Sequence, residues 1–181
     1  MKKAALVIIA LIFTCQSYSQ IYHQDLQLGV SAGTVFGTSG VGVQASSELK
    51  FLKHLSVSYR VLTSDAVIFA GLFSSSKSYR EQAMLFGFHI PVSPTRHQLF
   101  FKVGPGYFMQ KSSTSALLYS ESNTAQGQAT VFETGYSYEY KAMDLQVTAT
   151  YASSSISSEM PVNFGIRIGL DPFYWLFPQK K

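Results

Sequence analysis

The chain has 181 residues, of which 46% are hydrophobic and 13% are charged, and its formal net charge is +4. This length suits one domain. Beyond residue 19, no stretch contains the roughly 18 consecutive apolar residues that a membrane-spanning helix needs. The 14 basic and 10 acidic residues are nearly balanced and do not form the clustered basic face of a nucleic-acid-binding protein, so we expect no nucleic-acid partner.

The first 19 residues predict a cleaved signal peptide. Lys2 and Lys3 precede an apolar run over 4–13, and the small residues Ser17 and Ser19 occupy the −3 and −1 positions of a cleavage site. Removing the two lysines leaves 12 basic against 10 acidic residues, a net charge of +2. The pattern therefore predicts export from the cytoplasm.

Cys15 is the only cysteine in the chain. Because it lies in the predicted leader, we expect no disulfide, no cysteine zinc ligand and no thiol nucleophile in the mature protein. A second interpretation treats residues 11–15 as a lipoprotein box that would leave a lipidated Cys15 at the N-terminus. Thr14 stands where such boxes usually carry Ala, Gly or Ser.

From residue 25 onward the apolar residues recur with period 2, which indicates β-strands. Several of the alternating runs exceed the five or six residues of an ordinary globular strand. In each run one face is bulky and apolar, and the other is rich in Gly, Ser, Thr and Gln. The runs cover residues 26–36, 41–51, 55–61, 83–92, 98–109, 132–140, 145–151 and 162–170, with Leu85 as an exception to the alternation.

Eight alternating strands predict an all-β fold, a closed antiparallel up-and-down transmembrane β-barrel of about eight strands, because closure removes exposed sheet edges. The interior of an eight-stranded barrel has room for side chains only. We therefore expect the small polar face to point inward and the bulky, aromatic face to point outward, as a lipid-facing band would.

The connections support this topology, because outer-membrane barrels alternate short periplasmic turns with longer outside loops. Short connections are expected at 52–54, 93–97 and 141–143. Longer outside loops are expected at 64–80, 111–127 and 152–160, and only the first outside connection, at 38–40, is short.

Together with the run Gly104-Pro105-Gly106-Tyr107 and a leader ending Tyr-Ser-Gln, this pattern resembles the small eight-stranded outer-membrane barrels of the OmpA/OmpX type, a porin-like family, in Gram-negative Bacteroidota. The resemblance implies a signal peptide at 1–19, a barrel at 20–172 and an aromatic, basic tail at 173–181. It also implies an outer-membrane location, contact with outer-membrane lipid, and assembly by the barrel-assembly machinery.

Two segments depart from the family pattern. Family members often end on a strand whose last residue is Phe. Here Leu170 or Phe177 could serve that role, or residues 173–181 could lie as an aromatic tail at the membrane interface. The apolar stretch 66–73 falls in a predicted outside loop. It either continues the third strand past a bulge at Ser64 and Asp65, or forms an extra strand in a ten-stranded barrel, or is a loop that binds a partner.

The polar face carries charges that must be paired inside a narrow lumen, because an unpaired buried charge is costly. We expect a salt-bridged plug; the alternative is an ion pathway. The predicted barrel-interior charge network contains Glu48, Lys50, Arg60, Lys102, Glu133, Glu139 and Arg167.

No catalytic, cofactor or metal site is expected. The four histidines are scattered, with no His-x-x-x-His motif and no clustered carboxylates. His54 and His97 fall in predicted turns, His23 precedes the first strand, and His89 is expected as a solvated or interface residue near a strand end. Paired with Ser93, His89 does not reproduce the arrangement of the lipid-modifying barrels that the fold resembles.

The outside loops are rich in Ser, and the first residues expected to contact a partner are Leu117, Leu118 and Tyr119. The leading hypothesis is a non-enzymatic outer-membrane barrel that contributes to envelope structure or to surface interaction. The alternatives are a secreted, lipocalin-like barrel with its apolar face inside, and a lipid-modifying outer-membrane enzyme.

Overall fold

The computed structural model describes residues 26–51, 54–70, 73–92, 96–116, 119–157 and 160–172. The predicted signal peptide, the predicted tail at 173–181, Leu117 and Leu118 lie outside these ranges. Within them no helix has the length and hydropathy of a helical membrane crossing. Eight strands are present: β1 (Leu26–Gly37), β2 (Gly40–Phe51), β3 (Leu55–Ala70), β4 (Phe73–Pro91), β5 (His97–Ala116), β6 (Tyr119–Tyr140), β7 (Met143–Ser153) and β8 (Val162–Leu170).

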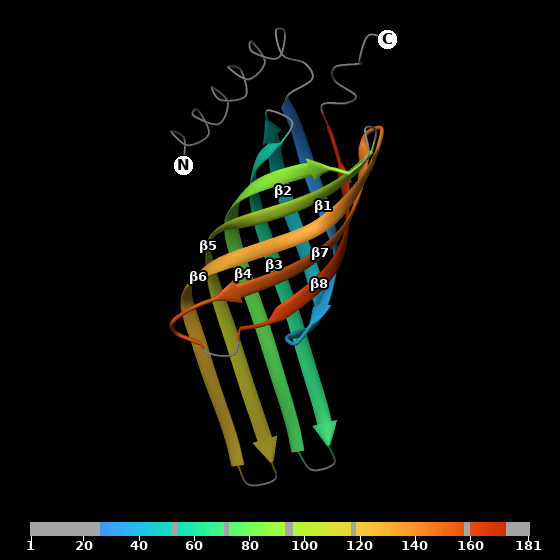
Figure 1. Cartoon of the computed structure of the whole chain (residues 1–181). Helices are drawn as coiled ribbons and strands as arrows, with labels where there is room; N and C mark the ends of the chain where they lie inside the picture. Colours follow the sequence, from blue (N-terminus) through green and yellow to red (C-terminus); the bar gives the residue numbers. More distant parts are fainter. Residues whose placement is uncertain are drawn as a thin grey trace, which may run out of the picture.

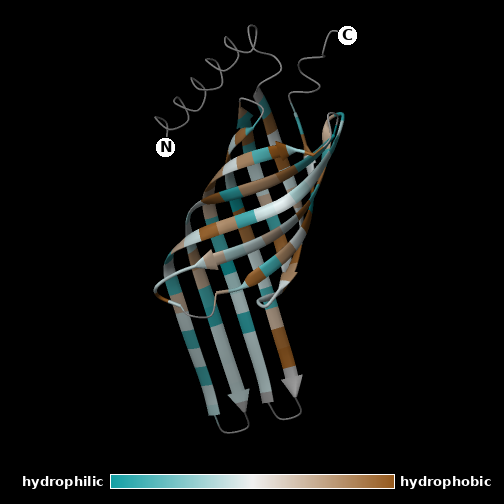
Figure 2. Cartoon of the chain, viewed as in Figure 1, coloured by the Kyte–Doolittle hydropathy of each residue, from teal (hydrophilic) through white to brown (hydrophobic). Residues whose placement is uncertain are grey.

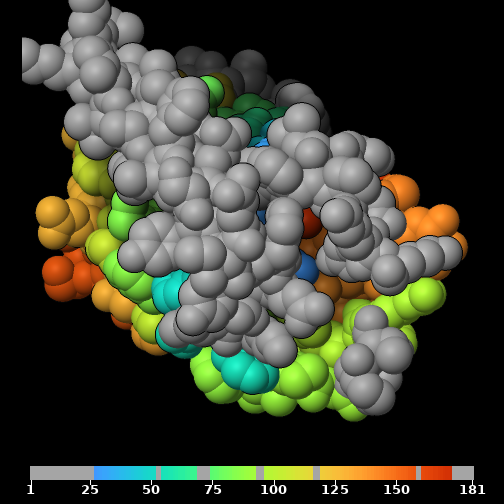
Figure 3. Space-filling view, turned by 90° about the horizontal axis from the view of Figure 1, so that it is seen from above, coloured from blue at the N-terminus to red at the C-terminus, as the bar shows by residue number. Residues whose placement is uncertain are grey.

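The strands form one closed antiparallel barrel in which each strand pairs with its neighbours in the sequence, and β1 pairs with β8 (Figure 1). The closing ladder runs from Val30↔Leu170 to Gly37↔Asn163. This confirms the predicted all-β, up-and-down barrel with eight strands, and the closed ladder of the described residues leaves no place for a ninth and tenth. In a view from the end that carries the short turns, side chains of the cyan and green strands lie along the lower margin and orange ones along the right (Figure 3).

One tight turn joins β1 to β2. Thr38 and Ser39 connect the paired residues Gly37 and Gly40. Gly40 has a φ of 106°, a region that residues with a Cβ rarely adopt. The Ser39 hydroxyl donates to Asn163 Oδ1 on β8 at 2.8 Å, which ties this turn to the closing strand.

Four strands continue past the barrel wall as a protruding sheet. The β3–β4 ladder extends to Ala70↔Phe73, and the β5–β6 ladder extends to Ala116↔Tyr119. On either side the neighbouring strands stop earlier, at Val41↔Asp65 and Thr130↔Ser153. Figure 1 shows the two hairpins extending beyond the barrel at the end opposite Leu26 of β1 and Leu170 of β8.

The prediction of outside loops at 64–80 and 111–127 is therefore wrong, because most of these residues form strands. The alternating pattern is lost there since both faces of the protruding sheet meet solvent, so no periodicity marks the strands. The interpretation that 66–73 extends the third strand is confirmed for residues 66–70, which belong to β3, whereas Phe73 begins β4. The predicted bulge at Ser64 and Asp65 is wrong, since Ser64↔Tyr79 and Asp65↔Ser78 follow in one continuous register.

The outer wall of the barrel is apolar on every strand, which confirms the predicted orientation. β8 shows the pattern in its shortest form: the side chains at even positions from Val162 to Leu170 are exposed and those at odd positions are buried. Figure 2 shows the brown, hydrophobic positions spread over the barrel strands, whereas the protruding sheet is mostly teal and white. This orientation contradicts the lipocalin-like alternative, which needs the apolar face inside.

Candidate functional site

The barrel interior contains the seven charged residues that the sequence singled out. All seven lie in ion pairs that cross the lumen between strands distant in sequence. Glu48 and Lys50 come from β2, Arg60 from β3, Lys102 from β5, Glu133 and Glu139 from β6, and Arg167 from β8.

Arg60 connects three other strands across the lumen. Its Nη1 donates to Glu133 Oε2 at 2.7 Å and to Thr150 Oγ1 at 2.9 Å. Its Nη2 donates to Glu81 on β4. The Arg60 side chain is fully buried. Because a guanidinium presents its donors in a planar fork, one arginine can hold two carboxylates in a fixed geometry.

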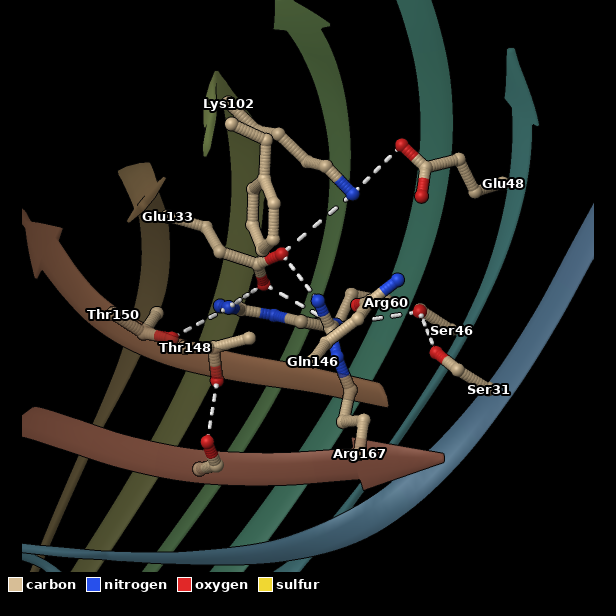
Figure 4. Close-up of polar contacts among 12 residues, drawn as sticks. Ser31, Ser46, Glu48, Arg60, Lys102, Glu133, Gln146, Thr148, Thr150 and Arg167 are labelled. Carbon is tan, nitrogen blue, oxygen red and sulfur yellow. Dashed lines mark hydrogen bonds and ion pairs between the residues drawn. The ribbon is translucent and has the colours of Figure 1, made fainter. Parts of the chain in front are cut away.

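Glu133 is the acidic centre of the same network (Figure 4). Arg167 Nη2 donates to Glu133 Oε1 at 2.6 Å, and Lys102 Nζ lies 3.7 Å from the same oxygen. Lys102 Nζ also lies 2.8 Å from Glu48 Oε1, which extends the network to β2. Arg60, Lys102 and Arg167 thus face three buried carboxylates, those of Glu48, Glu81 and Glu133, so the charges of these six side chains cancel.

A separate ion pair lies at the short-turn end of the barrel, where Lys50 contacts Glu139. Both side chains retain some exposure, unlike those of the central network. They line a cavity of about 60 Å³ together with Asp144 and Gln146. This pair therefore spans the lumen between β2 and β6 near that end, and both of its side chains remain partly accessible to water.

The sequence analysis missed two members of the network. Glu81 lies two residues before the run that was recognised at 83–92, and extending that alternation by one step would have placed it beside Ala83 on the inner face. His89 was expected to be solvated or at an interface, and this was wrong, because it is buried in the lumen. Its odd position on β4, shared with Gly87 and Leu85, points it inward.

His89 lies in a serine–histidine–glutamate cluster that does not have triad geometry. Its Nε2 is 3.0 Å from both Ser56 Oγ and Glu48 Oε1. In a catalytic triad the hydroxyl and the carboxylate bind opposite ring nitrogens. Here both contact the same nitrogen, and Nδ1 has no hydrogen-bond partner in the described part of the chain. The cluster therefore packs the lumen and is not arranged to activate the serine.

The remaining histidines that the structure describes lie at the short-turn end. His54 Nδ1 is 3.0 Å from the carbonyl oxygen of His89, and the His97 ring contacts Tyr136. His23 lies outside the described residues. Within the described ranges, no group of three or more His, Cys, Asp or Glu side chains has the geometry of a metal site.

The half of the lumen nearer the protruding sheet contains a large apolar cluster, which corrects the expectation of an interior filled by small polar and charged side chains. Leu62, Leu85, Phe108 and Val131 are fully buried there. Tyr79 joins the two halves: its ring stacks on Phe108, and its hydroxyl donates to Glu81 at 2.8 Å. The complete buried apolar cluster contains Val35, Leu62, Tyr79, Ala83, Leu85, Phe108, Ala129, Val131 and Ala152.

Phe100 fills the lumen next to the charged network. Its ring centre lies 4.7 Å from Lys102 Nζ and 5.8 Å from the centre of the His89 ring. A Cβ at Gly135 on the neighbouring strand would lie only 2.5 Å from this ring, so the glycine provides the space for it. Large side chains and ion pairs thus fill the interior at both levels.

Tyr119 is the one predicted partner-contact residue that the structure describes. It lies at the tip of the β5–β6 hairpin, is exposed, and its hydroxyl donates to Glu121 at 2.6 Å. It is far along the protruding sheet from the lumen, so it forms no common site with the charged network.

No protein-family model and no curated protein sequence matches the chain. Several solved structures share its fold. The attachment invasion locus protein Ail of Yersinia pestis matches with a TM-score of 0.53 and 14% identity, covering 81% of this chain and 95% of Ail. The N-terminal β-barrel domain of Pseudomonas aeruginosa OprF matches with a TM-score of 0.56 and 9% identity, covering 81% and 98%. A major outer membrane protein of Thermus thermophilus matches with a TM-score of 0.57 and 11% identity, covering 81% and 99%.

Proposed function

We propose that the protein is a non-enzymatic integral outer-membrane barrel with a filled interior, which presents its protruding four-stranded sheet outside the cell. The observation that carries the proposal is the apolar outer wall, which is continuous around the barrel. Contiguous exposed apolar surface of this extent is rare in soluble monomers. The shared fold of Ail, OprF and the Thermus protein supports the membrane location.

The dimensions of the wall fit a bilayer. A transmembrane β-strand needs about 9–11 residues when tilted by about 45°, and β8 has 9 residues. Its outward side chains, at even positions from Val162 to Leu170, are all large and apolar. An apolar band about 25 Å tall is typical of outer-membrane barrels.

The interior supports a structural rather than a transport or catalytic role. Arg60 and Arg167 are held by carboxylates across the lumen, and the apolar half beside them is packed with Phe108, Leu62 and Val131. A conducting barrel needs a water-filled path. An enzyme needs substrate to reach its nucleophile, whereas Ser56 and His89 are enclosed by the barrel wall.

The protruding sheet supports the surface-interaction part of the proposal. On β4 to β6 both faces of this sheet carry mainly Ser, Thr and Gln, whereas residues 66–70 of β3 are Ala, Val, Ile, Phe and Ala, with Val67 and Ile68 exposed. Residues 66–70 of β3 and 119–129 of β6 have no strand on their outer side among the described residues. The sheet therefore offers side chains and unpaired backbone groups to the medium.

Cysteine labelling tests both the membrane location and the orientation. Thr124→Cys places a thiol on the protruding sheet, and Arg96→Cys places one at the short-turn end. A membrane-impermeant maleimide should label Thr124→Cys in intact Gram-negative cells, and Arg96→Cys only after the outer membrane has been opened. In parallel, unboiled protein from the outer-membrane fraction should migrate differently from boiled protein on a gel.

Equal labelling of both variants in intact cells would contradict the orientation. Recovery of the protein from the soluble periplasmic or medium fraction, with no difference between boiled and unboiled samples, would contradict the membrane location. The wild-type chain is the labelling control, because its single cysteine lies in the predicted leader.

A further inference from the structure

The outer wall changes character within two rows of side chains on β3 to β6. The register aligns outward side chains into rows across these strands. The row Val57, Phe86, Val103 and Phe132 is wholly apolar. Successive rows toward the hairpin tips are Tyr59, Met84, Pro105 and Thr130; then Val61, Gln82, Tyr107 and Gln128; then Thr63, Arg80, Met109 and Gln126; and then Asp65, Ser78, Lys111 and Thr124.

An open groove of about 830 Å³ lies at this transition. Tyr59, Met84 and Tyr107 form its apolar walls, and each is about half exposed. The Tyr59 hydroxyl donates to Gln82 Oε1 at 2.9 Å, which fixes one side of the groove. At the β7 end, the Ser154 hydroxyl donates to the Gln128 carbonyl oxygen at 2.8 Å.

The groove coincides with an interruption of the β4–β5 ladder. Pairing stops at Ala83↔Gly106 and resumes at Phe86↔Val103. Pro105 lies in the gap, and proline has no N–H with which to pair. The β4–β5 hydrogen-bond ladder is therefore interrupted at the point where the apolar rows end.

Two cations lie just beyond the groove. Arg80 and Lys111 are exposed, face outward, and are diagonal neighbours on β4 and β5, since Arg80 pairs with Met109. Diagonal neighbours in a sheet are about 7–8 Å apart, within reach of one shared anion for long side chains. Neither makes an ion pair with a described residue. Asp65, diagonal to Arg80 on β3, is the one carboxylate in these rows of the outward face.

We infer that this groove and the cation pair bind one phosphorylated, acylated glycolipid of the outer leaflet, of the lipid A class. The inference rests on the proposed membrane location. The apolar row and the next row, with Tyr59 and Met84, receive the acyl chains. The amides of Gln82 and Gln128, one row further and beside the Tyr107 ring, meet the sugar. Arg80 and Lys111, in the two rows beyond, bind the phosphate. The order acyl chain, sugar, phosphate along the wall matches this lipid class better than it matches a glycerophospholipid.

The test is a titration of the purified barrel, in dodecyl maltoside micelles, with bisphosphorylated lipid A, followed by native mass spectrometry. Wild-type protein should bind one lipid. The double variant Arg80→Gln/Lys111→Gln should bind at least tenfold more weakly, and Asp65→Asn should bind more tightly than wild type. The double variant Arg96→Gln/Lys141→Asn removes two exposed cations at the other end of the barrel and should bind as wild type does.

Further ligands separate the possible sources of affinity. Dephosphorylated lipid A and phosphatidylglycerol should each bind at least tenfold more weakly than bisphosphorylated lipid A, and inorganic phosphate at millimolar concentration should not compete. Unchanged affinity in Arg80→Gln/Lys111→Gln would overturn the inference, as would an equal loss in the control variant or equal binding of phosphatidylglycerol. The difference between boiled and unboiled gel mobility of each variant reports the barrel itself, so failure of this site is distinguishable from failure of the proposed function.

Discussion

The barrel and the protruding sheet share the strands β3 to β6 but differ in the pattern of side chains along them. Along β6, the barrel part alternates between outward Phe132 or Tyr136 and inward Glu133 or Ser137. The protruding part of the same strand, from Tyr119 to Gly127, is almost wholly polar and exposed on both faces. The backbone ladder to β5 continues without a change of register.

This contrast shows that backbone pairing and side-chain environment are independent in this chain. The ladder satisfies the N–H and C=O groups equally in both regions. In the barrel, one face meets a filled lumen and the other meets lipid in the proposed location, so polar and apolar side chains alternate along each strand. In the protruding sheet both faces meet water, and stability there depends on the ladder and on its attachment to the barrel.

The largest expected effect comes from breaking the buried network in the barrel. Arg60→Met removes the guanidinium between Glu81 and Glu133 and leaves Glu81 with the Tyr79 hydroxyl as its hydrogen-bond donor among the described residues. Removing one partner of a buried ion pair costs about 3–5 kcal/mol. Urea titration of the detergent-solubilised protein, followed by the fraction that keeps the unboiled gel mobility, should show this loss.

The double variant Arg60→Met/Glu81→Gln separates lost charge pairing from lost packing. It also removes the stranded carboxylate, so it should recover at least half of the stability lost by Arg60→Met. Lys50→Met, at the more exposed mouth pair, should cost less than about 1 kcal/mol. If Arg60→Met were as stable as the wild type, the buried ion-pair network would not be a main source of the barrel's stability.

An intermediate effect is expected from placing the same charge on the two regions. Ile166 lies at the centre of β8 and is 47% exposed, and Val67 lies on the protruding part of β3 and is 59% exposed. Ile166→Arg should destabilise the inserted barrel by about 2–4 kcal/mol, the cost of arginine on a lipid face near the bilayer midplane. Val67→Arg should change stability by less than about 0.5 kcal/mol, as an exposed surface substitution does.

Both variants are measured by urea titration of the protein reconstituted in lipid bilayers, since the expected cost of Ile166→Arg depends on contact with lipid. Similar exposed fractions make the pair well matched, since solvent accessibility alone predicts the same small effect for both. Equal losses, or a larger loss for Val67→Arg, would show that the boundary between membrane and medium is misplaced.

The smallest effect is expected from shortening the protruding sheet. Replacing residues 112–123 by a two-residue Asn-Gly turn joins Lys111 to Thr124, which already pair across β5 and β6. Asn-Gly favours the type I′ turn that suits such hairpins. The barrel should still assemble, with unboiled gel mobility retained and unfolding free energy changed by about 1 kcal/mol or less, within the range of ordinary surface changes. Failure to insert would show that the barrel depends on the protruding sheet.

The barrel could be predicted well from the sequence because alternation depends on the contrast between its two faces. Ile166 and Arg167 on β8, or Phe132 and Glu133 on β6, are neighbours that point to different environments, and this is visible in the residue order. The same logic places the charged residues inward. It does not predict that Arg60, from β3, reaches Glu133, on β6, because the distance between strands across a lumen depends on closure.

Two parts of the structure could not be predicted by alternation alone. Leu85, Phe100 and Phe108 are apolar but lie on the inward face, so they depart from the alternation of apolar outward and polar inward residues. Only the structure shows that the lumen contains apolar layers that accommodate them. The strands over 66–70 and 119–129 lack any contrast between faces. Their pairing follows from the hairpins that continue out of the barrel, which only the register reveals.

The pairing of β1 with β8, the seam that closes the barrel, affects the order in which the strand pairs form during assembly. Every other strand pair joins segments that are adjacent in sequence, whereas the seam joins the two ends of the barrel, from Val30↔Leu170 to Gly37↔Asn163. Its ladder is far shorter than the β5–β6 ladder, which runs from His97↔Tyr138 to Ala116↔Tyr119. Local hairpins form with little loss of chain entropy, and joining distant ends costs more. We therefore expect the β1–β8 seam to be the last pair of strands to join when the barrel assembles.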